Sequence, residues 1–72
     1  MKKHELVAKI AQDTGLSKVV SAAALESVLH GIVQSLKKGQ TVTLVGFGTF
    51  KASRRVARFS AGKGLKDAIN KT

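Results

Sequence analysis

The chain has 72 residues, no Cys, and thirteen Lys and Arg against four Asp and Glu, which gives a net charge of +9. A chain this short buries only about 60% of the surface that it exposes when unfolded, so a lone monomer is marginally stable. Without cysteine, disulfides and thiolate metal sites are excluded as a source of stability, and oligomerisation is the expected remedy. The absence of Cys also fits a reducing compartment.

The charge is distributed unevenly along the chain. Residues 1–36 hold four basic and three acidic residues, whereas residues 37–72 hold nine basic residues and one acidic residue. The second half therefore carries almost the whole positive charge. Such an asymmetric basic field implies a polyanionic partner, with nucleic acid first and an anionic membrane surface second.

The N-terminal residues argue against export and against a membrane span. His4, Glu5 and Lys9 follow the first lysines before any apolar run develops, which is not the pattern of a signal peptide. No stretch approaches the roughly eighteen consecutive apolar residues that a spanning helix needs. We therefore expect a soluble, cytoplasmic protein with no membrane partner.

Apolar residues at helical spacing predict two helices in the first half of the chain. The first covers about residues 3–14 and ends before Gly15, which tolerates a left-handed C-terminal conformation. The second covers about residues 18–38, with Ser17 as its N-cap and Gly39 at its end.

The second predicted helix carries an apolar stripe that is too broad for one short helix to cover. This breadth predicts burial against a second subunit, and the alternative is that the sheet of the same chain covers all of it. The stripe residues recur at steps of three and four: Leu25, Val28, Leu29, Ile32, Val33 and Leu36.

The second half of the chain alternates apolar and polar residues, which predicts strands. We expect a hairpin of residues 41–45 and 49–54, a third strand at 57–61, and a short helix at 64–70. The expected fold class is therefore α+β, with two N-terminal helices, a three-stranded antiparallel sheet and a short C-terminal helix. These elements are expected to form a single domain over residues 1–72.

The connection between the second and third strands is the weak point of this prediction. The chain would have to reverse through Arg55 and Val56, whereas tight hairpin turns favour Asn, Asp or Gly at positive φ.

Several stretches of the second half, taken in order, resemble the bacterial HU/IHF family of histone-like DNA-binding proteins. The resemblance implies an intertwined dimer, a homodimer or a heterodimer with a paralogue, whose long helices form a base and whose sheets form a saddle for double-stranded DNA. It also implies a location in the bacterial nucleoid. The residues that carry it are Gly46-Phe47-Gly48-Thr49-Phe50, then Arg54, Arg55 and Arg58, then Ala61-Gly62-Lys63-Gly64-Leu65-Lys66-Asp67-Ala68.

This chain departs from the family pattern at the second hairpin. The family has a long β-arm there, usually with a proline wedge that enters the DNA, whereas nearly all of the arm is missing and the chain has no Pro. Two explanations stay open: an armless protein, natural or engineered, or a segment that the printed sequence omits. The poor turn chemistry favours the second. An armless chain would grip phosphates and bend DNA weakly.

Cationic residues of the second half are the candidate DNA contacts. Arginines suit bidentate phosphate contact and a narrow minor groove, and the start of the last helix favours an anion. The alternative is a set of solvated charges at a hairpin tip and a helix start. The candidates are Lys51, Arg54, Arg55, Arg58, Lys63 and Lys66, with Lys3 as a weaker one.

Apolar residues of the long helix and the sheet are the candidate dimer core. The three phenylalanines could stack on unpaired bases, but core packing is the favoured interpretation. The predicted dimer core consists of Leu25, Val28, Leu29, Ile32, Leu36, Leu44, Phe47, Phe50 and Phe59.

Nothing in the sequence predicts an enzyme. His4 and His30 are too far apart to suggest a metal, and no acid–base pair or nucleophile motif is present. We therefore expect no cofactor and no small-molecule substrate. The predicted function is largely nonspecific binding of double-stranded DNA for compaction or bending. IHF-like site-specific bending, an RNA-binding basic dimer and a purely structural dimerisation module are the alternatives.

Overall fold

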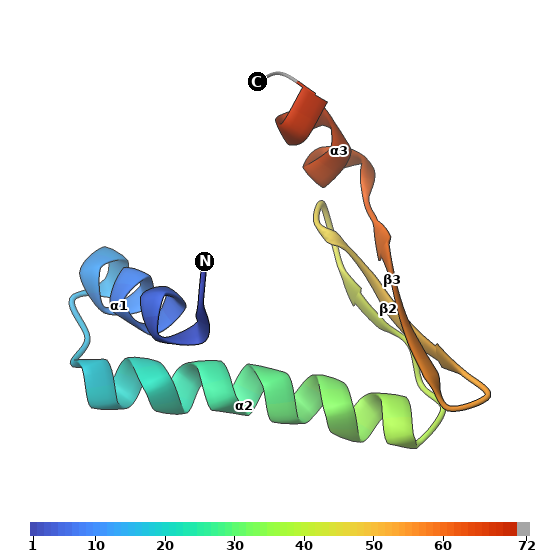
Figure 1. Ribbon diagram of the computed structural model, residues 1–72, viewed down its shortest axis with the longest axis horizontal. Helices are drawn as coiled ribbons and strands as arrows, with labels where there is room; N and C mark the ends of the chain where they lie inside the picture. Colours follow the sequence, from blue (N-terminus) through green and yellow to red (C-terminus); the bar gives the residue numbers. More distant parts are fainter. Residues whose placement is uncertain (71–72) are drawn as a thin grey trace. The chain divides into compact units, whose positions relative to one another are not determined.

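The chain folds into helices and a three-stranded antiparallel sheet in a computed structural model that describes residues 1–70 (Figure 1). This confirms the predicted α+β class and element order. Contacts divide the chain into two units, Met1–Gly31 and Ile32–Thr72, with the boundary inside α2. The elements are α1 (Lys3–Thr14), α2 (Lys18–Lys37), β1 (Val42–Leu44), β2 (Gly48–Ser53), β3 (Val56–Ala61) and α3 (Lys63–Asn70).

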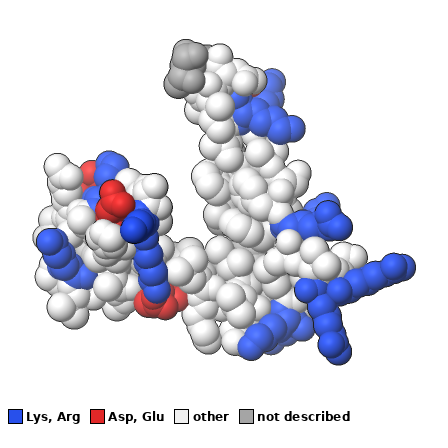
Figure 2. All heavy atoms as spheres, in the orientation of Figure 1, with Lys and Arg blue, Asp and Glu red and all other residues white. Residues whose placement is uncertain are grey.

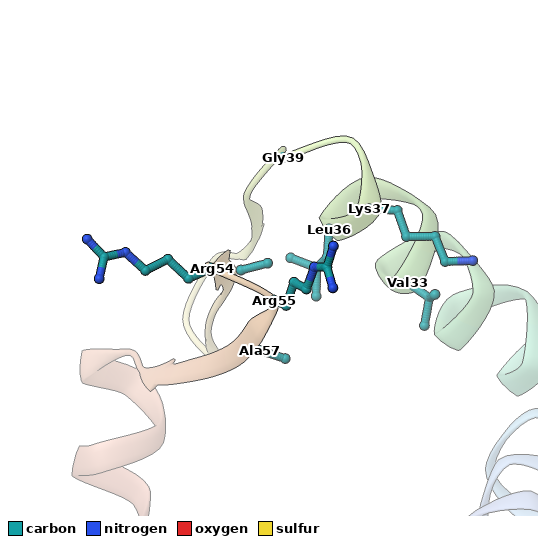
Figure 3. A pocket seen from close by; sticks show the side chains of 8 residues that line it. Val33, Leu36, Lys37, Gly39, Arg54, Arg55 and Ala57 are labelled. Atoms are coloured by element: carbon teal, nitrogen blue, oxygen red, sulfur yellow. The ribbon is translucent and has the colours of Figure 1, made fainter.

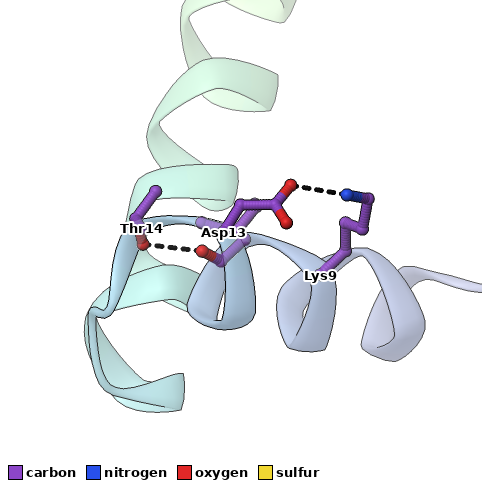
Figure 4. Close-up of polar contacts among 4 residues, drawn as sticks. Lys9, Asp13 and Thr14 are labelled. Atoms are coloured by element: carbon purple, nitrogen blue, oxygen red, sulfur yellow. Dashed lines mark hydrogen bonds and ion pairs between the residues drawn. The ribbon is translucent and has the colours of Figure 1, made fainter.

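The end of α1 is stabilised by local polar contacts. Gly15 takes the left-handed conformation at φ +76°, as its position predicted. The Thr14 hydroxyl donates to the carbonyl of Ile10 at 2.6 Å, and Lys9 pairs with Asp13 one turn later at 2.6 Å (Figure 4). Gly15 ends the helix where the sequence predicted, and the two side-chain contacts stabilise its last turn.

Helix α2 has a cap at each end. The Ser17 hydroxyl accepts a hydrogen bond from the Val20 N–H at 3.1 Å, which confirms the predicted N-cap. At the other end Gly39 has φ +76°, and the Gln40 N–H donates to the carbonyl of Ser35 at 2.9 Å. This backward bond is the Schellman pattern, which terminates the helix.

The apolar surface of α2 is largely uncovered within one chain. By length and composition alone the helix could cross a membrane, with a mean hydropathy of 1.4 over its most apolar window. Glu26 and His30 interrupt its apolar residues, however. Val28, Leu29 and Val33 are 55%, 41% and 47% exposed. A helix of this composition also suits burial against a partner subunit, which is what the broad stripe predicted.

The sheet has the strand order β1-β2-β3, with both pairings antiparallel. The carbonyl of Leu44 accepts a hydrogen bond from the Phe47 N–H at 2.9 Å across the β1–β2 turn. Gly46 has φ +83° there, as the third residue of a type II turn requires.

The β2–β3 turn differs from the prediction. The reversal occurs at Arg54 and Arg55, with φ of +51° and +67°, and not at Arg55 and Val56. The register places Phe50 opposite Phe59, so only two residues remain for the turn. Positive φ at both is the type I′ pattern, which suits the twist of a hairpin even though arginine does not favour it.

Helix α3 begins against the β1–β2 turn, one residue earlier than predicted. The Gly62 N–H donates to the carbonyl of Phe47 at 2.8 Å. A Cβ on Gly64 would lie 2.4 Å from the carbonyl oxygen of Gly46. This close backbone approach explains the glycines around Lys63 and fixes the start of α3 on the sheet.

The three phenylalanines form an aromatic cluster within the chain. The ring of Phe59 lies 4.9 Å from that of Phe50 and 5.5 Å from that of Phe47, in tilted arrangements. Even so, no apolar side chain of the described residues is buried, and only Ser21 and Gly48 are. A single chain therefore has no closed hydrophobic core.

Candidate nucleic-acid interface

Strand alternation separates an aromatic face of the sheet from a cationic one. Phe50 is opposite Phe59, and Ala52 is opposite Ala57 on the same face. On the other face, which we call the outer face, a basic pair is surrounded by small hydroxyl residues. The outer face consists of Thr43, Thr49, Lys51, Ser53, Val56, Arg58 and Ser60.

Lys51 and Arg58 are direct cross-strand partners at the centre of the β2–β3 hairpin. Both side chains are exposed. Side chains of directly opposed residues begin about 5 Å apart, so the two cations lie close together. Two positive groups that share one surface patch favour an anion between them.

The two turn arginines take different directions. Figure 3 shows Arg55 extending toward Leu36 and Arg54 extending away from it. Both arginines border an open hollow of about 540 Å³, whose lining also includes Val33 and Ala52. Both turn arginines are exposed, so both predicted DNA contacts at the turn are accessible.

Lys63 and Lys66 lie on the first turn of α3, and both are exposed. They are three residues apart and so share one side of the helix. The free backbone N–H groups and the dipole of a helix start add to the positive potential there. This arrangement fits the predicted phosphate contact.

Lys3 occupies a different environment from the other candidates. Its ammonium group forms an ion pair with Glu26 across the α1–α2 corner. Both residues of this pair belong to the same chain. This contact weakens the case for Lys3 as a DNA contact.

The unit that contains the sheet holds almost no negative charge. No Asp or Glu occurs between Glu26 and Asp67. In the view of Figure 2 the acidic side chains lie mainly on the unit with α1, and Lys and Arg extend from the unit with the strands. The three strands therefore supply no carboxylate that could neutralise the cations of the outer face.

The predicted dimer-core residues share one property, which is partial exposure. Phe47 and Phe59 are 46% and 44% exposed, and Leu44 is 41% exposed. None of the nine is buried in the single chain: Leu25, Ile32, Leu36 and Phe50 are half-buried, and the others are exposed. Their exposure supports the prediction that they meet a second chain.

Sequence reasoning missed the hydroxyl groups of the outer face. Thr43 is opposite Thr49, and Thr49 is opposite Ser60, next to the basic pair. Hydroxyls are common partners of DNA phosphates. The signal was available in the alternation of the strands, which puts these residues on the side of Lys51.

Comparison with known proteins places this chain among small DNA-binding proteins. The family model described as "Bacterial DNA-binding protein" matches residues 1–59. DNA-binding protein HRm of Rhizobium meliloti is 41% identical over 90 residues, which cover 97% of this chain and all of the relative. DNA-binding protein HU-alpha of Aeromonas hydrophila is 43% identical over 89 residues, covering 96% of this chain and 99% of the relative.

Solved structures agree with these matches. HU from Thermotoga maritima superposes with a TM-score of 0.89 at 36% identity, covering 96% of this chain and 98% of that chain. A chain of an Anabaena HU–DNA cocrystal structure superposes with a TM-score of 0.86 at 29% identity, covering 96% of this chain and 97% of that chain.

The fold and the basic outer face thus define a small bacterial DNA-binding protein of the histone-like class. The chain belongs to the HU family, as its sequence resemblance predicted.

The chain is shorter than its sequence relatives at an internal position. The match to HRm runs over 90 residues and this chain has 72, so at least 18 aligned positions have no residue here. The resemblance places the missing segment at the β2–β3 hairpin, where Arg54 and Arg55 close a tight turn.

Proposed function

We propose that the protein is a histone-like, nucleoid-associated protein of the bacterial cytoplasm that binds double-stranded DNA with little sequence preference. It contacts backbone phosphates and the minor groove, and it compacts or bends the DNA. HU relatives and a neighbour crystallised with DNA support this function. Family membership supports an architectural role and no enzymatic one.

The outer face of the sheet is the observation that carries this proposal. It presents Lys51 and Arg58 among hydroxyl groups, and its strands contain no carboxylate. Lysine, arginine and hydroxyl side chains all donate to phosphate oxygens, which carry no base identity. A face of this composition therefore binds duplexes of different sequence about equally.

The binding unit is an intertwined homodimer, in which residues 1–72 of each chain act as one domain. A single chain buries no apolar side chain among its described residues, so it lacks the main source of folding free energy. A second copy supplies the missing partner for the stripe of α2 and for the aromatic cluster.

Six cationic residues form the proposed DNA contact in each chain, and Lys3 is a peripheral seventh because Glu26 neutralises it. Arg54 and Arg55 extend the surface at the hairpin tip, and Lys63 and Lys66 extend it at α3. The six residues are Lys51, Arg54, Arg55, Arg58, Lys63 and Lys66.

Fluorescence anisotropy with labelled duplexes of unrelated sequence tests the proposal. We expect similar affinities for all duplexes, and Lys63→Ala weakens binding about equally on each. Lys9→Ala is the control, because Lys9 is already paired with Asp13 in α1 and its loss should leave DNA affinity unchanged. A loss confined to one duplex would indicate site-specific recognition instead.

Competition with double-stranded RNA of matched length separates the remaining alternatives. We expect unlabelled DNA to displace the labelled duplex at lower concentration than RNA does. Stronger displacement by RNA would identify an RNA-binding protein. No complex at all at moderate salt would leave only a structural dimerisation role.

A further inference from the structure

The β2–β3 hairpin is assembled from groups that oppose its own formation. Lys51 lies directly opposite Arg58, and like charges in that position destabilise a sheet. The contact of Phe50 with Phe59 favours the same register, so the repulsion between the cations lowers the stability of the hairpin without preventing it. The ion pairs of the described residues, Lys3 with Glu26 and Lys9 with Asp13, involve neither of them.

The turn of the same hairpin supplies a second, independent observation. Arg54 and Arg55 both have positive φ, a conformation that costs free energy for any residue with a Cβ. They also bring two more cations to within a few residues of the basic pair. Backbone strain at the turn and charge repulsion at the centre of the strands thus occur in one hairpin, which carries no acidic residue.

We propose that Lys51 and Arg58 form a bridging site for one phosphate group of the DNA backbone, and that this phosphate stabilises the hairpin. The inference rests on the proposed DNA-binding function. Placed between the two cations, a phosphate adds two attractions that outweigh the repulsion between them, and charge-assisted hydrogen bonds hold it. DNA binding and the folding of the β2–β3 hairpin are therefore coupled.

The neighbouring hydroxyls fit the same site. Thr49 and Ser60 form the next cross-strand pair on the outer face, beside Lys51 and Arg58. Their hydroxyl groups can donate to the free oxygens of the bound phosphate. The site thus holds cationic and neutral donors from two paired strands, without a carboxylate from either strand.

A double-mutant cycle tests the coupling. The variants are Lys51→Thr, Arg58→Thr and the double variant, since Thr keeps the strand propensity. In the free protein at low salt and fixed concentration, each single variant should raise the Tm by about 2–5 °C, and the double variant should add little more. With saturating duplex DNA the order of the Tm values reverses. Each single variant then melts at a lower temperature than the wild type.

Lys66→Gln is the matched control, because it also removes a proposed DNA contact, has no cross-strand partner and leaves the helix propensity of α3 nearly unchanged. It should reduce the DNA-induced rise in Tm without the gain in the free protein that the sheet variants show. The inference is overturned if Lys51→Thr and Arg58→Thr have additive effects on the free protein, or if both lower its Tm. DNA that raises the Tm of neither wild type nor control would instead contradict the proposed function itself.

Discussion

The ring of Phe59 lies directly against the backbone of Gly48. A Cβ at Gly48 would come within 2.4 Å of the ring and within 2.7 Å of the carbonyl oxygen of Ser60. Only glycine allows the ring to pass there and to reach Phe47 and Phe50. The aromatic cluster therefore depends on the absence of one methyl group in β2.

Gly48→Ala should destabilise the protein by about 1–3 kcal/mol, because the added methyl overpacks against a ring and a strand backbone. Gly31→Ala is the control: a Cβ there meets nothing within 4 Å, and alanine is favoured in a helix interior. We expect it to stabilise by up to about 1 kcal/mol. Denaturant unfolding at fixed protein concentration measures both, and equal effects would contradict the proposed packing.

Replacing the turn Arg54-Arg55 by Asn-Gly should stabilise the free protein by about 1 kcal/mol or more, because both residues then accept positive φ readily. The same change should weaken DNA binding through the loss of two cations. Arg54→Ala with Arg55→Ala removes the charges but keeps the strain, so it should bind DNA as weakly without the full gain in stability. Thermal unfolding and anisotropy separate the two effects.

Ser21 is fully buried, and its hydroxyl has no hydrogen-bond partner among the described residues. Ser21→Ala should therefore leave stability unchanged or raise it by about 1 kcal/mol, since an unsatisfied buried hydroxyl is removed. Ser21→Val should lower stability by about 1–3 kcal/mol through overpacking. A clear loss of stability in Ser21→Ala would show that the second subunit supplies a partner for the hydroxyl.

Leu29→Lys should disrupt the dimer, because it places a charge in the apolar stripe of α2. Ser27→Lys is the control on the opposite side of the same helix. Sedimentation and far-UV circular dichroism should show a folded dimer for the wild type and for Ser27→Lys, and an unfolded chain for Leu29→Lys. A wild type that sediments as a well-folded monomer would contradict the dimeric account.

Local signals in the sequence were sufficient for most of the fold. Ser17 was predicted as an N-cap and accepts the expected bond, and Gly15 and Gly39 have the expected positive φ. These devices act within one or two turns of chain, so the sequence displays them directly. The turn at Arg54 and Arg55 was placed one residue too late, because the pairing of the strands decides it and overrides turn preference.

The candidate site was less accessible to sequence reasoning. The charges were visible, but the opposition of Lys51 and Arg58 requires the strand register. The pairing of Lys3 with Glu26 joins two helices across 23 residues and has no local signal. Alternate residues of a strand share one face, and this rule holds for polar residues as well as for apolar ones. It places the hydroxyl groups on the face of Lys51 and Arg58.

The central claim is that a dimer binds the phosphates of duplex DNA with its basic outer face. The salt dependence of DNA affinity tests this claim most directly. The logarithm of the association constant should fall linearly with the logarithm of the salt concentration, with a slope of about 0.9 per phosphate contact. Duplexes of unrelated sequence should give parallel lines. Lys51→Thr should make the slope shallower, since both subunits lose a contact. An affinity that stays constant as salt rises would contradict the account.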